Sequence, residues 1–175
     1  PPAAAAKPGF RTLEAFKSPP FRWFWAHIAS VALIQGIQRF AFVWLELDIS
    51  DRSSAAGLVS FALGIPVFFF SLPAGVLADR VDRRLLLFGS QAAAILLTAL
   101  TAIIVAAEWA NLSLVFLLAL GVGATTAFGQ PVRQAIVPSL VERERLMNAI
   151  VLNTLGMNLM MIVGPALGGG VIRLL

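Results

Sequence analysis

Five long apolar stretches dominate the sequence and restrict what the chain can fold into. They cover residues 23–47, 57–78, 85–107, 109–132 and 146–172, and the last four contain no charged residue. A helix needs about 20 such residues to cross the hydrocarbon core of a bilayer. Backbone polar groups in lipid must be hydrogen-bonded within the segment, which favours helices over strands. We therefore expect an all-α, polytopic transmembrane helix bundle over residues 21–175, preceded by a Pro- and Ala-rich cytoplasmic tail over residues 1–20. The tail is expected to be mobile, with one turn of surface helix around Leu13–Phe16.

The composition agrees with this fold class and excludes several others. Charged residues make up 13% of the 175 residues, whereas a soluble domain carries about 25%. The net charge of +4 does not indicate a nucleic-acid partner, because the basic residues lie at the ends of the apolar runs. The chain has no cysteine and one histidine, His27, so we expect no metal and no cofactor. Because no phosphate loop or nucleophile–base pair is present either, an enzyme is not expected.

The basic residues are distributed unequally between the two sides of the bundle. Ten fall in the tail and in the second and fourth links: Lys7, Arg11, Lys17, Arg22, Arg80, Arg83, Arg84, Arg133, Arg143 and Arg145. On the other side lie only Arg52 and Arg173. Short cytoplasmic loops carry the excess of Lys and Arg, so the N-terminus is expected in the cytoplasm. The tryptophans lie near the ends of the spans, as an interfacial belt predicts: Trp23, Trp25, Trp44 and Trp109.

The segment Gly75-Val-Leu-Ala-Asp79-Arg80-Val-Asp82-Arg83-Arg84 links spans two and three. It reads as a helix end, a tight turn and a basic cluster, in which Gly75 would let another backbone come close. Asp79 could accept hydrogen bonds at a helix N-terminus. The arginines could bind carboxylates or anionic lipid head groups. An ordinary cytoplasmic loop explains the same residues equally well.

This segment resembles the signature loop of the major facilitator superfamily, although Asp82 stands where that pattern usually has glycine. The chain is similar to the secretion-effector branch, which includes enterobactin exporters. Further segments carry the resemblance: Ser18-Pro-Pro-Phe-Arg22, Gln38-Arg39-x-Ala41-x-x-Trp44-Leu45, Gly57-Leu-Val59, Pro131-x-Arg133-Gln-Ala135-x-x-Pro138-x-Leu140-Val141 and Leu146-x-Asn148-Ala149. The resemblance implies the N-terminal half of a two-half carrier, in which this cytoplasmic gating loop closes one side.

Span five contains a second motif, Gly164-Pro165-Ala-Leu-Gly168-Gly169, with Gly156 earlier on the helix. Small residues four apart let helices approach closely, and Pro165 invites a bend. Close packing alone would explain the pattern. The resemblance adds that it is typical of the antiporter motif of exporters, and therefore favours efflux.

Polar residues follow one face of span one. Gln35, Arg39, Phe42 and Glu46 are spaced as on one helical face. We expect Gln35, Gln38 and Arg39 to line a substrate cavity. The alternative is that Arg39 extends toward Glu46 or Asp48 at the surface. Spans two to five contain no buried carboxylate, so a proton-coupling acid in this chain is doubtful, and Glu46 could simply lie at the interface.

The favoured function is secondary active efflux of a small molecule such as a drug, siderophore or metabolite across the bacterial inner membrane, with a proton as a possible coupling ion. Because five spans are too few for such a carrier, a C-terminal half is expected to be missing from this sequence. The alternative is a non-transporting membrane scaffold, a partner subunit or an inactive gene fragment.

Overall fold

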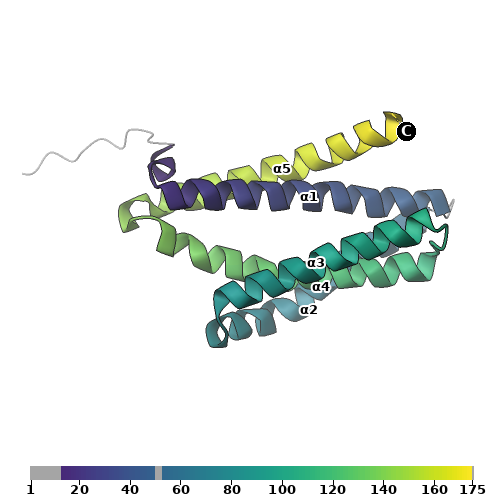
Figure 1. Cartoon of the computed structure of the whole chain (residues 1–175), viewed down its shortest axis with the longest axis horizontal. Coiled ribbons are helices and arrows are strands. Elements are labelled where there is room, and N and C mark those ends of the chain that lie inside the picture. Colours follow the sequence, from purple (N-terminus) through teal and green to yellow (C-terminus); the bar gives the residue numbers. More distant parts are fainter. Residues whose placement is uncertain (1–12, 50–52, 175) are drawn as a thin grey trace, which may run out of the picture.

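The computed structural model describes residues 13–49 and 53–174, with the side chains of residues 53–56, Ala78, Asp79 and Leu174 left out. Within these ranges the chain is helical and has no strand, as the apolar stretches predict. Five long helices follow one another (Figure 1). They are α1 (Pro19–Ile49), α2 (Ser53–Arg80), α3 (Arg83–Ala106), α4 (Leu112–Leu140) and α5 (Leu146–Leu174), with short 3-10 turns η1 (Glu14–Lys17) and η2 (Arg143–Arg145). All five are long and apolar enough to span a membrane.

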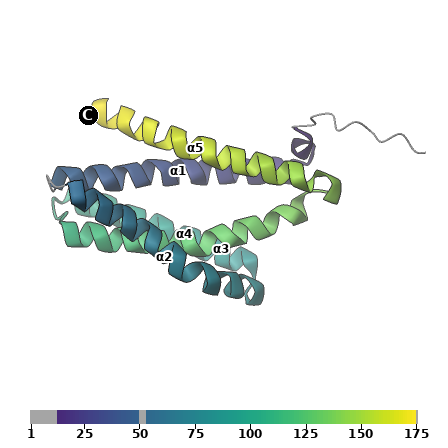
Figure 2. The ribbon, with the colours of Figure 1, turned by 180° about the vertical axis from the view of Figure 1, so that it is seen from behind.

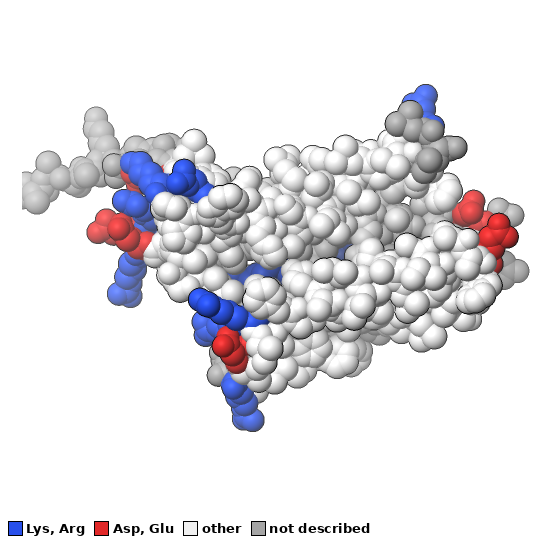
Figure 3. All heavy atoms as spheres, viewed as in Figure 1, with Lys and Arg blue, Asp and Glu red and all other residues white. Residues whose placement is uncertain are grey.

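Successive helices run in opposite directions, so the links gather at two ends of the bundle (Figure 1). We define the basic end as the end where α1 begins and where Arg22, Arg80, Arg84, Arg143 and Arg145 lie. The far end is where α1 ends. Figure 3 shows charged side chains concentrated at these two ends, with residues other than Lys, Arg, Asp and Glu covering most of the length between them. This distribution is what a bilayer requires.

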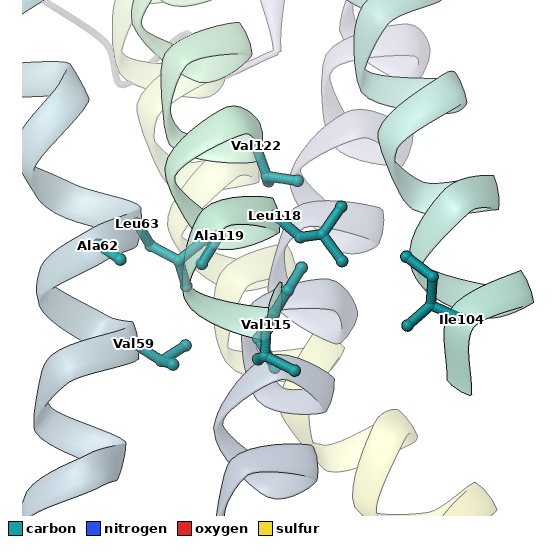
Figure 4. Packing of buried hydrophobic residues seen from close by; sticks show 9 residues of the cluster. Val59, Ala62, Leu63, Ile104, Val115, Leu118, Ala119 and Val122 are labelled. Carbon is teal, nitrogen blue, oxygen red and sulfur yellow. The ribbon is translucent and has the colours of Figure 1, made fainter. Parts of the chain in front are cut away.

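The helices form two close pairs, α1 with α5 and α2 with α4, and α3 packs along α4. At the far end α1 lies close to α2 and α4, whereas toward the basic end α2 and α3 lie apart from α1 and α5 and α4 bends back toward α5 (Figures 1 and 2). An apolar cluster closes the far end, with Val59, Ala62 and Leu63 of α2 pointing toward Val115, Leu118, Ala119 and Val122 of α4 (Figure 4). Phe42 of α1 and Ile104 of α3 belong to the same cluster. The two pairs therefore meet through this apolar seal at the far end, and α4 meets α1 and α5 again at the basic end through a smaller cluster that contains Phe21, Val137 and Ala149.

In each of the two helix pairs, one glycine determines how closely the two helices approach each other. A Cβ atom on Gly164 of α5 would lie 2.8 Å from the Gly36 Cα and from the Leu33 carbonyl oxygen of α1. A Cβ atom on Gly123 of α4 would lie 2.5 Å from the Leu63 carbonyl oxygen of α2. Real Cβ atoms do not approach backbone this closely, so both contacts depend on the absence of a side chain.

The ends of several helices differ from the apolar stretches. The fourth helix begins at Leu112 rather than Trp109 and continues to Leu140, past Pro131 and Pro138. Arg133 is therefore a buried helical residue, 6% exposed, and is not part of a solvated link. The second helix extends from Ser53 to Arg80. The apolar stretches give the length of the lipid-facing part of each helix. The helices themselves continue into the membrane interface wherever backbone hydrogen bonds can form.

The turn near the N-terminus is not a surface feature. It forms η1, and Ala15 is fully buried beside Phe21, Val137 and Ala149. The backbone N–H of Ala15 donates a hydrogen bond to Asn148 Oδ1 at 3.1 Å. The turn thus fastens the start of α1 to α4 and α5 at the basic end. Residues 1–12 of the tail lie outside the described residues.

The predicted belt of tryptophans holds for three of the four. Trp23, Trp44 and Trp109 are exposed on the bundle surface. Trp25 instead donates a hydrogen bond from Nε1 to the Leu152 carbonyl oxygen of α5 at 3.0 Å. Its indole also covers Gly156, where a Cβ atom would lie 2.9 Å from the ring. Trp25 is consequently part of the α1–α5 contact.

Candidate functional site

A cleft of about 550 Å³ lies between α4 and α5 in the half of the bundle nearer the basic end. Amide, hydroxyl and thioether side chains line much of it, together with Val137, Pro138 and Ile150: Gln130, Gln134, Asn153, Thr154, Met157, Asn158 and Met161. Asn153 is 7% exposed, and its Oδ1 has no hydrogen-bond partner among the described residues. An unpartnered buried amide oxygen is costly, so this cleft offers hydrogen bonding that the described chain does not itself satisfy.

A second space lies beside this cleft, nearer the middle of the bundle. A smaller space of about 30 Å³ is lined by Gln35, Gln38 and Arg39 of α1 and by Leu63, Val122, Gly123, Thr126 and Met161. Met161 lines both spaces. The polar residues of α1, α4 and α5 thus border two neighbouring spaces, which together we call the polar path.

The three polar residues expected on span one do not all point the same way. Gln38 Nε2 donates a hydrogen bond to Thr98 Oγ1 of α3 at 2.8 Å. Gln35 is half-buried and Arg39 is exposed. No carboxylate among the described residues lies within ion-pair distance of Arg39, so its extension to Glu46 or Asp48 is not what the structure shows. Figure 3 shows cationic atoms in the crevice between the helix pairs.

The path ends at the apolar seal. Leu63 and Val122 belong both to the lining of the smaller space and to the seal. Phe42, one helical turn beyond Arg39, is 2% exposed and completes it. In the described residues the polar spaces therefore lie on the basic-end side of the seal, and apolar side chains fill the bundle at the seal itself.

The turn between α2 and α3 occupies the basic end. Asp82 is the N-cap of α3, and its carboxylate accepts a hydrogen bond from the Arg84 N–H at 2.8 Å. Arg83 Nη1 donates to the Ala135 carbonyl oxygen of α4 at 3.3 Å, while Arg80 and Arg84 are exposed. No atom would lie within 4 Å of a Cβ atom on Gly75, so the expected close approach of another backbone is absent among the described residues. The side chain of Asp79 lies outside the described residues.

The N-cap explains why aspartate suits position 82, and it yields a prediction. Replacing Asp82 with alanine should lower the free energy of unfolding by about 1 kcal/mol, because a first-turn N–H of α3 loses its acceptor. Asparagine caps about as well as aspartate, so Asp82→Asn should leave stability unchanged. Thermal unfolding of the two purified variants in detergent measures both changes in stability. Equal losses for the two substitutions would show that charge, and not capping, matters here.

The glycine motif of α5 faces α1. Besides the contact at Gly164, Pro165 approaches Gly36, and Cβ atoms on Gly168 and Gly169 would lie 3.0 and 3.4 Å from the Phe40 ring. All five motif residues, Gly156, Gly164, Pro165, Gly168 and Gly169, can therefore be accounted for by helix packing. The sequence motif alone left open which helix they would meet.

Several residues of the cleft were missed by the sequence reasoning. Gln130, Asn153 and Asn158 are uncharged, and nothing in the periodicity of two separate spans indicates that they face each other. Glu46 was placed at the interface, yet it is fully buried. Within residues 13–49 and 53–174, no three His, Asp or Glu side chains come together as a metal site would need.

The five long apolar helices define a class, that of multi-pass membrane proteins. The chain belongs to the transmembrane secretion effector family, whose model matches residues 11–175. It is also 28% identical over 127 residues to a protein of Staphylococcus aureus (strain NCTC 8325 / PS 47) named Staphyloferrin A transporter. That similarity covers 72% of this chain and 32% of the relative, so the chain spans about a third of the relative's length. No solved structure matches.

Proposed function

We propose that this chain is part of the N-terminal half of a secondary transporter that exports a small molecule by alternating access. The observation that carries the proposal is the polar path between the two helix pairs, lined by Gln35, Arg39 and Asn153 and ending at an apolar seal. In a family of membrane transporters, a path open at one end and sealed at the other has the form of one of the two access states.

We also propose the orientation and the membrane. The excess of arginines at the basic end places that end in the cytoplasm by the positive-inside rule. The membrane would then be the bacterial inner membrane, and the path would be open to the cytoplasm. The far end, with the exposed carboxylates Asp48 and Glu108, would face outward.

The cytoplasmic turn would act as the latch of the transport cycle. In this proposal Asp79 binds a helix end of a C-terminal half when the cytoplasmic side is closed, and Arg80 and Arg84 contribute charge nearby. Arg83, bonded to Ala135, ties the turn to α4, so that turn and helix would move together. Asp79→Asn is expected to lower transport and to leave membrane insertion unchanged.

The chemistry of the path favours substrates rich in oxygen atoms. Glutamine, asparagine and threonine side chains donate hydrogen bonds to such atoms, and Arg39 adds a positive charge. A siderophore, a drug or a metabolite with these groups would fit, and the relative's name gives the siderophore additional weight. Efflux and antiport remain parts of the proposal, favoured by the α5 glycine motif.

The test uses Arg39. Export by cells that express the complete reading frame, in a host lacking its own exporters, should fall about ten- to a hundredfold in Arg39→Leu. A hydrogen bond to a charged group is worth about 1.5–3 kcal/mol, and each 1.4 kcal/mol is a factor of ten. Arg173→Leu removes an exposed charge at the end of α5 and serves as the control. Undiminished export by Arg39→Leu would refute this role of Arg39.

The alternative is a membrane scaffold or partner subunit that transports nothing. Neighbouring polar spaces inside an apolar bundle have no evident purpose in a scaffold, and this favours the transporter. A reading frame that encodes no further spans beyond Leu175, together with no export of any compound in a panel of dyes and chelators, would favour the scaffold.

A further inference from the structure

A carboxyl group without any partner lies inside the bundle near its far end. Glu46 of α1 is 0% exposed. Neither of its carboxyl oxygens has a hydrogen-bond partner among the described residues. Glu46 is the only carboxyl among the buried polar side chains of the described residues, and it does not line the polar path.

Glu46 lies one turn from an apolar cluster to which α1, α2, α3 and α4 all contribute. Glu46 follows Phe42 by one turn on the same face of α1, and Phe42 packs with Val59 of α2 and Val115 of α4. From α3 the cluster contains Ile104. Glu46 therefore lies at the outer side of the seal, away from the polar path.

The charged groups of this region do not compensate a negative charge on Glu46. Arg39 lies two turns away on α1, on the other side of Phe42, and within ion-pair distance of no described carboxylate. Asp48 and Glu108 are exposed and carry the same sign as an ionised Glu46. Arg173 is exposed on the last turn of α5. Asp51 and Arg52 lie outside the described residues.

We propose that Glu46 is a proton-binding site coupled to the seal at the far end. An ionised carboxylate that is buried without a partner costs many kcal/mol, and such a group takes up a proton instead. Closing the seal buries Glu46, and its carboxylate binds one proton from the water of that side to become a neutral carboxyl. Opening the seal rehydrates the group, and the same proton returns to that water. The inference rests on the proposed alternating access, and it supplies the acid that the sequence alone left doubtful.

The coupling has a direction. A proton that binds only the sealed state stabilises it, so acidifying the far side should favour the sealed form, and raising the pH there should favour opening. Glu46→Gln is permanently neutral and nearly isosteric. It should hold the seal closed at every pH.

Infrared spectroscopy of the purified protein in lipid at neutral pH tests proton binding without a transport assay. A protonated carboxyl shows a carbonyl stretch that an ionised one lacks, and this band shifts in heavy water. We expect Glu46→Gln to remove one such band, while Glu108→Gln, which changes an exposed carboxyl at the same end, leaves it in place. If the variant fails to fold, carbon-13 glutamate in the unaltered protein should shift the band and carbon-13 aspartate should not.

Absence of a glutamate-derived band would overturn the proposal, because Glu46 would then be ionised in the sealed state. Failure of this proton-binding proposal can be distinguished from failure of the transport proposal. Export without the band would support the transport proposal and contradict the proton site. The band without any export would support the proton site and contradict the transport proposal. A second readout is the labelling of Phe42→Cys by a water-soluble maleimide. The reactive thiolate fraction of any cysteine rises with pH, so the exposed Glu108→Cys at the same end serves as the reference. Labelling of Phe42→Cys from the far side should rise more steeply with pH than that reference, and adding Glu46→Gln should remove the excess.

Discussion

Gly164→Ala should separate α1 from α5 and destabilise the bundle by about 1–3 kcal/mol or more. The added Cβ atom would lie 2.8 Å from three backbone atoms of α1, the Gly36 Cα, the Ile37 nitrogen and the Leu33 carbonyl oxygen. Overpacking of a well-filled contact costs about this much, and backbone cannot move aside as a side chain can. The apparent melting temperature in detergent and the yield of monodisperse protein should both fall.

Gly170→Ala is the matched control for that experiment. It adds the same atom to the same helix, but no other atom lies within 4 Å of the added Cβ. Alanine is favoured over glycine inside a helix by about 1 kcal/mol, so this variant should be neutral or slightly stabilising. If the two variants unfolded alike, the α1–α5 contact at Gly164 would not be as close as the structure places it.

Gly123→Ala should have the second large effect, by pushing α2 away from α4. Its Cβ atom would lie 2.5 Å from the Leu63 carbonyl oxygen and 3.1 Å from Pro66 Cγ. Leu63 is part of both the seal and the smaller space of the path. The variant should therefore lose about 1–3 kcal/mol of stability and also loosen the seal. Unfolding in detergent measures the first effect, and maleimide labelling of Phe42→Cys from the far side measures the second.

Gly121→Ala provides the comparison on the same helix. There the new Cβ atom would meet only the side chain of Leu97, at 3.1 Å from Cδ1, and that methyl group can rotate away. We expect a stability change well below that of Gly123→Ala. A larger loss for Gly121→Ala would mean that the α3–α4 contact, and not the α2–α4 contact, limits the packing of this bundle.

The fold could be predicted from the sequence because lipid imposes a simple rule. A long run without charge must be a helix across the bilayer, and residues 85–107 or 146–172 allow no other reading. Helix ends were less predictable, since the uncharged run ends at residue 132, whereas α4 continues to Leu140 with Pro131 and Pro138 inside it. Proline is tolerated there when neighbouring helices and side chains satisfy the freed backbone groups.

The site was only partly predictable, for a different physical reason. The spacing of Gln35 and Arg39 predicts a shared face on one helix, and the structure places both beside the same space. Which helices border that space depends on pairing across the bundle. Asn153 and Gln130 are therefore found only when α4 and α5 are side by side. The burial of Glu46 likewise depends on where α2 and α4 cross α1.

The measurement that tests the central claim most directly is cysteine accessibility from each side of the membrane. The chain has no cysteine, so a single one can be introduced without removing others. Asn158 lines the path, and its neighbour Leu159 is 55% exposed on the surface that we assign to lipid. We expect Asn158→Cys, in oriented vesicles of the complete protein, to react with an impermeant maleimide added on the basic side only. Leu159→Cys should react from neither side. Labelling of Asn158→Cys from the far side alone, or equal labelling of both variants, would contradict a polar path open at the basic end.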